Sequence, residues 1–486
     1  MEQQNKAAGL SPAEAIDLLE SLHGDATAAL IAAVRRFAEG GPPPTAKERA
    51  KFRYPELRVR YKADRPIPKF ARAYGQLTWP GDYSVTITQP GFFRPYLMEQ
   101  LQLLVDDYGA ELHARPSESE IPYSFVLDAA GAAAYENVPA EELARHFPNP
   151  RLSNVGDGVV DSLMHKLPDG ARPLALFDAL RTDYSLKRLE HYTGAPWQDT
   201  QPWILFTNYQ RYVEEFIRWA AAQVSSSKGG LSLSCPGRVR IEAGDPDAEM
   251  KALAAPWRKY QMPAYHLQTS DNDGVTLINI GVGPSNAKTI TDHLAVLRPH
   301  CWLMVGHCGG LRHTQRIGDY VLAHAYLRRD KILDDLVPLE VPIPAIAEVQ
   351  VALQDAAELI SGDSGEVLKR RLRTGTVVSY ADRNWELNYA NERQLLSQSR
   401  AIAVDMESAC IATQGFRMRV PYGVLLCVSD KPIHGEIKLP GVSDRFYESA
   451  IASHLRIGLE TINLLKINRN ELHSRKLRAF DEPPFR

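Results

Sequence analysis

Two carboxylic acids in the C-terminal half of the chain each follow a short apolar run. Asp430 comes after the run at residues 424–428, and Glu407 comes after the run at residues 401–404. Runs this short, bounded by turn residues, are typical of buried strands. Ligands of α/β proteins bind at the carboxyl ends of strands. A carboxyl group there can protonate a leaving group or stabilise a developing positive charge.

Two glycine-rich segments follow further apolar runs. Residues 301–311 (CWLMVGHCGGL) predict a strand that enters a glycine-rich turn, and residues 275–287 (VTLINIGVGPSNA) predict a second strand-to-turn transition. The second lacks the third glycine of the dinucleotide fingerprint. Each piece alone is more often an ordinary turn or helix cap. Together, the four transitions predict one pocket along one edge of a sheet.

Composition favours a globular protein with an ample core. The chain has 486 residues, 44% of them hydrophobic, which suggests two domains. A net charge of -3 gives no general attraction to nucleic acid or membranes. The five cysteines form no CxxC pair, so neither a zinc site nor a disulfide framework is indicated. The polar N-terminus and the absence of an apolar run of about 18 residues lead us to expect a cytoplasmic location.

The two parts of the chain differ in pattern. Residues 1–175 predict an α+β domain. A helix start at Ser11 is followed by helical stretches at 15–22 and 26–37, a further helix is predicted at 90–108, and strands are predicted near 57–61, 73–78, 83–88, 110–114 and 123–127. Residues 176–486 alternate strands with helices, which predicts an α/β fold with a mainly parallel or mixed sheet flanked by helices. The basic end, 473–486, is expected to be an ordered arm or a frayed terminus.

Five motifs of this second part resemble the purine nucleoside phosphorylase and nucleosidase superfamily. They are INIGVGPSNAKT, GHCGGLRHTQRIGDY, TGTVVSYADRNWE, AVDMESA and VSDKPIHGEIKLPG. Taken end to end, the chain is similar to the AMP nucleosidase family within it. The resemblance implies hydrolysis of the N-glycosidic bond of AMP to adenine and ribose 5-phosphate. It also implies a homohexamer that needs no cofactor or metal for the chemistry, is activated by Mg-ATP and is inhibited by phosphate.

The resemblance implies roles for residues at the four transitions. Asp430 matches the acid that acts at N7 of the departing purine, and Glu407 matches the glutamate that holds the ribose hydroxyls, with Met406 against the sugar. Asn384 and Trp385 correspond to the wall of the base site, where Trp385 would stack on adenine. Two alternatives stay open: Glu407 as a helix-start carboxylate, and Trp385 as a core residue.

Other correspondences are less firmly anchored. His191 matches a histidine that relatives contribute to a neighbouring subunit, although an ordinary surface histidine is an equal alternative. Arg211 falls near the arginine of an anion-binding turn where a helix begins, and it competes with Lys431 and Lys438 for the 5′-phosphate. The remaining substrate-binding candidates are Gly283, Ser285, His307, Gly309 and Ser429.

One departure from the family pattern bears on the nucleophile. Relatives that use phosphate have an arginine where this chain has Met304, and losing that cation favours water. A phosphorylase, or a nucleotide sensor without catalysis, are the competing readings. In residues 1–175, Arg58, Arg60, Lys62 and Arg65 are the anion-binding candidates for a regulatory site, with a solvated strand face as the alternative.

Overall fold

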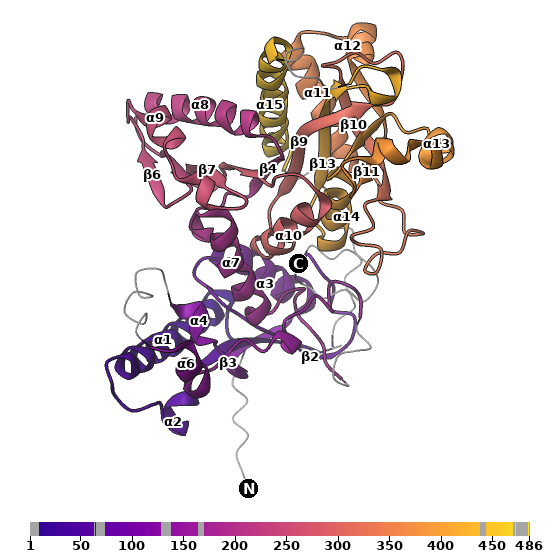
Figure 1. Cartoon of the computed structure of the whole chain (residues 1–486). Coiled ribbons are helices and arrows are strands. Elements are labelled where there is room, and N and C mark those ends of the chain that lie inside the picture. Colours follow the sequence, from indigo (N-terminus) through magenta and orange to yellow (C-terminus); the bar gives the residue numbers. More distant parts are fainter. Residues whose placement is uncertain are drawn as a thin grey trace. The chain divides into compact units, whose positions relative to one another are not determined.

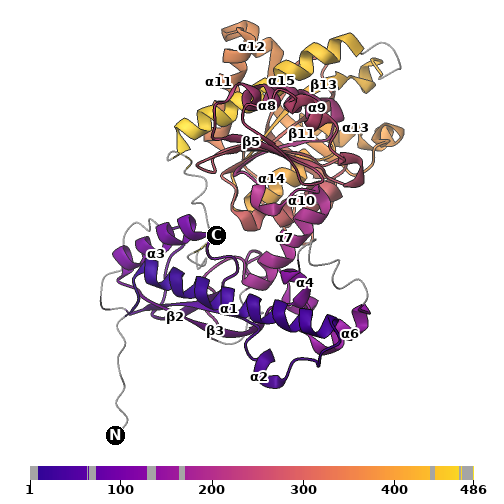
Figure 2. The ribbon, with the colours of Figure 1, turned by 90° about the vertical axis from the view of Figure 1, so that its left-hand side faces the viewer.

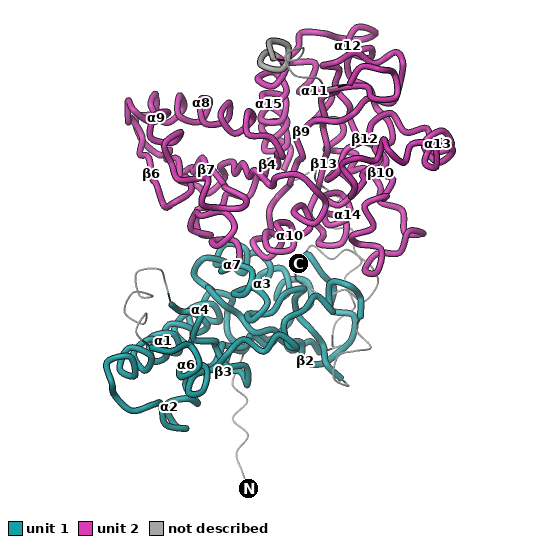
Figure 3. The backbone as a smooth tube through the Cα atoms, viewed as in Figure 1, with its two compact units in different colours: residues 1–187, 478–486 teal, residues 188–477 magenta. Residues whose placement is uncertain are grey.

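The computed structural model describes residues 9–62, 64, 73–127, 138–163, 170–437, 444–469, 472 and 485. Its chain forms two compact units, residues 1–187 with 478–486 and residues 188–477 (Figures 1 and 3). The boundary falls inside helix α7 (Ala179–Thr193). No helix among the described residues is both long and apolar enough to cross a membrane.

The first unit packs helices on a three-stranded antiparallel sheet with the order β2-β1-β3. Helix α1 begins as predicted, with a capping box between Ser11 and Glu14. Its apolar face joins Phe52, Tyr54 and Phe147 in the core of the unit. Phe485 also belongs to this unit: it is buried, and its N–H donates to the carbonyl of Leu174 over 2.9 Å. The elements are α1 (Pro12–Ala38), α2 (Ala46–Arg49), β1 (Arg53–Tyr61), β2 (Gly81–Thr86), α3 (Arg94–Tyr108), β3 (Glu111–Glu120), α4 (Tyr123–Val126) and α6 (Ala140–His146).

Two strands predicted in this unit are wrong. Residues 73–78 form bends and loop, because the N–H of Tyr74 is satisfied by the Gln100 side chain at 2.8 Å instead of a neighbouring strand. Residues 123–126 form helix α4, which follows Pro122. A short apolar run does not by itself distinguish a strand from a buried helical turn.

The second unit contains one ten-stranded mixed sheet with the order β12-β11-β10-β13-β9-β4-β8-β7-β5-β6. This confirms the predicted fold class of the unit. Its strands are β4 (Trp203–Thr207), β5 (Leu231–Cys235), β6 (Val239–Glu242), β7 (Ala264–Thr269), β8 (Val275–Asn279), β9 (Cys301–Gly310), β10 (Tyr320–Arg329), β11 (Leu372–Tyr380), β12 (Ala403–Asp405) and β13 (Tyr422–Asp430).

The sheet closes on itself at one end, because β12 pairs with both β11 and β9. Strands β9, β12, β11, β10 and β13 therefore form a closed ring. In this ring Gly309 of β9 pairs with Val404 of β12 on one side and with Asp430 of β13 on the other. The register thus brings the ends of β12 and β13, with their carboxylates, to the same glycine.

Helices cover both faces of this sheet (Figures 1 and 2). Helices α8, α11 and α15 pack on one side, and α10 and α14 pack against each other on the other. Each helix that leads into the site starts directly after a strand, as expected for α/β units. The helices are α8 (Gln210–Ser226), α9 (Ala248–Leu253), α10 (Pro284–Leu294), α11 (Ala347–Ser361), α12 (Gly365–Arg371), α13 (Tyr389–Gln398), α14 (Ser408–Met418) and α15 (Asp444–Ile467).

Candidate active site

Glu407 lies at the junction of β12 and α14, and its side chain is completely buried. Its Oε1 accepts a hydrogen bond from the N–H of Gly283 at 2.6 Å, and its Oε2 accepts one from Nδ2 of Asn208 at 2.9 Å. Gly283 precedes α10 and Asn208 precedes α8. The carboxyl group therefore joins three strand-to-helix transitions that are far apart in the sequence.

Asp405 fixes the backbone that carries Glu407. It accepts hydrogen bonds from the N–H and hydroxyl of Ser408, the first of them at 2.8 Å, and from the hydroxyl of Ser379 at 2.5 Å. The N–H of Glu407 lies 3.3 Å from the same carboxylate. Asp405 thus satisfies donors in the first turn of α14, as a capping residue does.

Burial, with a further contribution from Asp405, favours the protonated form of Glu407. Burial, and next the charge of Asp405, raise the pKa of Glu407 to about 8, although the bonds from Gly283 and Asn208 oppose this. Burial also raises the pKa of Asp405. Two buried carboxyl groups so close together do not readily ionise at the same time.

This raised pKa predicts a pH-dependent stability difference for Glu407→Gln. The folded pKa of about 8 exceeds the ordinary value of 4.5, so the contribution of Glu407 to stability is complete below the lower value. This contribution is lost as the pH rises through the folded-state pKa of about 8. Glutamine does not ionise. We therefore expect the melting temperature of the variant, relative to the unchanged protein, to rise between about pH 5 and about pH 9.

Glu392→Gln is the matched control for this measurement. Glu392 is also buried, and burial alone would raise its pKa, but Arg329 and Tyr380 outweigh burial and lower the pKa. Because the folded-state pKa of Glu392 is lowered below its ordinary value of 4.5 and not raised, this variant should show no such rise over the range tested. Parallel pH profiles for the two variants would contradict the assignment to Glu407.

Asp430 ends β13 and is half-buried. Ser429 donates its hydroxyl to Asp430 and also lies 3.2 Å from the carbonyl of Cys308. The predicted glycine-rich turn beside it is wrong: Gly309 and Gly310 are strand residues of β9. A Cβ on Gly310 would lie 3.0 Å from the side chain of Val428 and 3.1 Å from that of Lys431, so a larger residue here would crowd both side chains.

The N-terminus of α8 carries a second group of predicted residues. Arg211 lies in the first turn and is half-buried. The ring of His307, on β9, lies 4.9 Å from the ring of Tyr209 and 5.4 Å from that of Tyr212. Tyr212 is hydrogen-bonded to His454 at 2.6 Å, which attaches this helix start to α15. His307 and Arg211 are thus brought to the same strand–helix junction.

The other predicted phosphate ligands differ in their surroundings. Lys431 is buried and forms an ion pair with Glu436, so its charge is already compensated. Lys438 lies outside the described residues. Of the two cations that the structure describes, Arg211 is the one in the first turn of an α-helix.

The predicted base-wall residues have unequal positions. Trp385 is 7% exposed and belongs to a hydrophobic cluster, with its ring stacked on Tyr380 at 5.8 Å. This packing is that of a core residue. A contact between Trp385 and adenine stays a prediction. Asn384 next to it is exposed, and Met406 beside Glu407 is half-buried.

The remaining predicted residues differ in how far they are exposed to solvent. Ser285 is exposed in the first turn of α10, and its carbonyl accepts a hydrogen bond from Thr289. His191 is exposed on α7, with its ring against Tyr192. Met304 is completely buried in the middle of β9. A contact of His191 with a second subunit stays a prediction.

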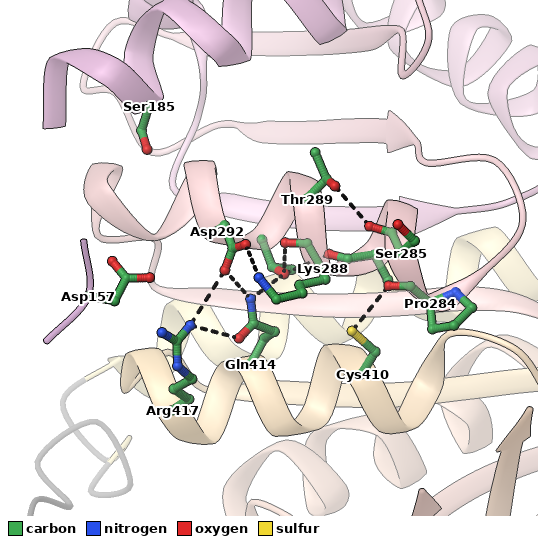
Figure 4. A network of polar contacts seen from close by, with 12 residues as sticks. Asp157, Ser185, Pro284, Ser285, Lys288, Thr289, Asp292, Cys410, Gln414 and Arg417 are labelled. Carbon is green, nitrogen blue, oxygen red and sulfur yellow. Dashed lines mark hydrogen bonds and ion pairs between the residues drawn. The ribbon is translucent and has the colours of Figure 1, made fainter. Parts of the chain in front are cut away.

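A polar network fixes α10 and α14 to one another (Figure 4). Asp292 of α10 accepts from Lys288 and from Gln414 of α14, both at 2.6 Å, and Arg417 lies 3.5 Å from it. Because Gly283 and Glu407 lie at the starts of these two helices, the network helps to hold the donor and the acceptor in register.

Two known proteins are similar to this chain over its whole length. The chain is 53% identical to AMP nucleosidase of Escherichia coli (strain K12) over 487 residues, which cover 99% of this chain and 100% of that protein. The chain belongs to the AMP nucleosidase family. AMP nucleosidase of Escherichia coli O157:H7 gives the same values. This confirms the family inferred from the five motifs.

Family models describe the two parts separately. Residues 14–171 match "Bacterial AMP nucleoside phosphorylase N-terminus", and residues 241–457 match "Phosphorylase superfamily". The crystal structure of AMP nucleosidase from Bacteroides thetaiotaomicron VPI-5482 is 28% identical and aligns with 59% of this chain and 98% of that one, at a TM-score of 0.43. A score this low carries no conclusion, so the family assignment comes from the full-length relatives.

Sequence reasoning missed Asn208 and the anchoring role of Asp405. Asn208 directly follows β4, and the rule that selected the other strand ends applies to it equally. An asparagine after a strand is also the usual sign of a turn, so the local pattern does not single out Asn208. In the sequence, Asp405 is one residue of the AVDMESA motif, with no separate signal for its bonds to Ser379 and Ser408.

Proposed function

We propose that this chain hydrolyses the N-glycosidic bond of AMP to adenine and ribose 5-phosphate. The observation that carries the proposal is full-length identity of 53% to AMP nucleosidase. The geometry supports it, because Asp430 and the Glu407 segment converge on Gly309 through the register of β9. A phosphorylase is the second candidate, since residues 14–171 match a family model that carries that word.

In this mechanism the two carboxyl groups act on opposite ends of the breaking bond. Cleavage of C1′–N9 moves electrons onto the purine, and a proton from Asp430 to N7 neutralises them. Glu407 accepts hydrogen bonds from the ribose hydroxyls, and its charge stabilises the oxocarbenium-like sugar. Water then attacks C1′ and releases a proton, which restores the protonated form of Asp430, and the products are ribose 5-phosphate and adenine.

The identity of the sugar product tests the function directly. With Met304 buried where phosphorolytic relatives have arginine, we expect no phosphate to be consumed. Incubation with AMP in phosphate buffer should release adenine and ribose 5-phosphate, measured by mass spectrometry. Ribose 1,5-bisphosphate as the product would show that the protein is a phosphorylase. No release of adenine at all would favour the third alternative, a nucleotide sensor without catalysis.

Arg211 is proposed to bind the 5′-phosphate at the N-terminus of α8, where the helix dipole also favours an anion. A charge-assisted hydrogen bond is worth about 1.5–3 kcal/mol. Arg211→Ala should therefore lower kcat/KM for AMP by about 10- to 100-fold and leave that for adenosine nearly unchanged. Equal losses for both substrates would show that Arg211 serves the ribose or the fold.

Regulation by Mg-ATP and phosphate, a homohexamer and a cytoplasmic location are proposed from the family resemblance alone. The structure gives no support to the strand β1 cations as an effector site. Arg60 and Lys62 are paired with Asp82 and Glu111, respectively, and Arg58 shares Glu56 with Arg115. Arg65 lies outside the described residues.

A further inference from the structure

The side-chain amide of Asn208 contacts the Glu407 carboxyl group but has no role in the mechanism proposed above. Its Nδ2 donates to Oε2 of Glu407 at 2.9 Å, while the backbone N–H of Gly283 donates to Oε1 at 2.6 Å. Each oxygen of the carboxyl group thus has its own donor, one from each of two different strand ends. An ionised carboxylate has about four acceptor positions, so capacity remains for both hydroxyls of a ribose.

Asn208 is itself held in place. It lies between β4 and α8, half-buried, and β4 pairs in register with both β8 and β9. A Cβ on Gly306 of β9 would lie 3.3 Å from Oδ1 of Asn208, so the missing side chain leaves room for the amide. The Oδ1 atom is buried and has no hydrogen-bond partner among the described residues. The side chain is therefore oriented by Glu407, its hydrogen-bond partner there.

We propose that Asn208 is a positioning residue for the reaction, which orients the Glu407 carboxylate toward the ribose hydroxyls and favours its ionised form. The proposal deepens the proposed function and rests on it. Asp405 from β12 disfavours the charge of Glu407. The Cys410 thiol from α14 faces the same carboxyl group, and burial first, with a smaller contribution from Glu407, raises the pKa of that thiol well above its ordinary value. The hydrogen bonds from Gly283 and Asn208 act in the opposite direction and lower the pKa of Glu407. Without Asn208, more of the enzyme would carry a neutral carboxyl, which is a poorer acceptor for a hydroxyl.

Asn208→Asp is the first test, because aspartate has the same shape but offers an acceptor where Glu407 needs a donor. We expect kcat/KM for AMP to fall by about 10- to 100-fold, the effect of losing one charge-assisted hydrogen bond. Asn208→Ala removes the donor without adding a charge and covers the case in which the aspartate variant does not fold. Thermal melting and circular dichroism check both proteins.

Asn463→Asp is the matched control. Asn463 lies exposed on α15, and its amide also donates to a glutamate, Glu460, at 3.1 Å. The same substitution there breaks the same kind of bond away from the site. We expect kcat/KM to be unchanged.

Three readouts separate positioning from a structural role. The loss in Asn208→Ala should shrink with 2′-deoxy-AMP, which lacks a hydroxyl for Glu407 to hold. The rise of kcat/KM with pH should move to higher pH in this variant. Combining it with Glu407→Gln should cost less than the product of the two single losses. Equal losses on both nucleotides, an unmoved pH profile and multiplicative losses would overturn the proposal.

Failure of the proposed function itself would be seen separately. In that case the unchanged protein would not release adenine from AMP, whatever residue stands at position 208. If the unchanged protein is active and both Asn208 variants match it, the proposal about Asn208 is wrong and the function stands.

Discussion

Asp430→Asn is expected to lower kcat for AMP by about 10²- to 10⁴-fold, the usual contribution of a general acid. The amide has nearly the same shape, but it does not give a proton to N7. Asp430 is half-buried at the end of β13, where the change disturbs little packing. KM should change much less than kcat, because the group acts mainly in the transition state.

A substrate with a better leaving group tests this role further. A β-ribosyl 5-phosphate of p-nitrophenol needs no protonation to depart, so Asp430→Asn should cleave it nearly as fast as the unchanged protein. Asp335→Asn, an exposed aspartate between β10 and α11, is the control and should leave kcat for AMP unaltered. Near-normal adenine release by Asp430→Asn would remove Asp430 from the mechanism.

Glu407→Gln is expected to lower kcat/KM for AMP by at least about 10²-fold, since charge-assisted bonds to two ribose hydroxyls are lost together. The loss should be largest near about pH 9, where the carboxyl group of the unchanged protein is ionised. The pKa of about 8 predicts that kcat/KM of the unchanged protein rises with pH through that value. The glutamine variant should lack this rise.

Steady-state kinetics with AMP and 2′-deoxy-AMP provide the check on Glu407→Gln. The variant should lose less on the deoxynucleotide, because one of the two bonds is already missing. If both nucleotides are affected equally, Glu407 supports the site without touching the sugar. Its bond to Gly283 would then be its main contribution, through the start of α10.

Much of the second unit could be predicted because its strands are short, apolar and closed by turn residues. The run at 424–428 lies within β13, and the motif around Glu407 begins α14 as expected. The local pattern at Gly309 and Gly310 did not reveal that these glycines lie within a strand. That depends on β12 closing onto β9, a contact between residues about 100 positions apart.

The same limit applies to single residues of the site. Trp385 is a large apolar residue in either reading, and only its neighbours in the folded chain identify it as a core residue. Asn208 becomes meaningful through Glu407, 199 positions away in sequence. In the first unit, Arg60 of β1 and Lys62 just after it form ion pairs with carboxylates of β2 and β3, which the local sequence does not reveal.

The closed ring of strands also affects how copies of this chain can associate. Because β12 pairs with β9, the large sheet has a single terminal strand among the described residues, strand β6. That edge is four residues long and carries Arg240 and Glu242, both exposed. Short charged edges resist pairing with another chain. A homo-oligomer of this protein would therefore be expected to join its subunits by contacts other than pairing of their β6 strands.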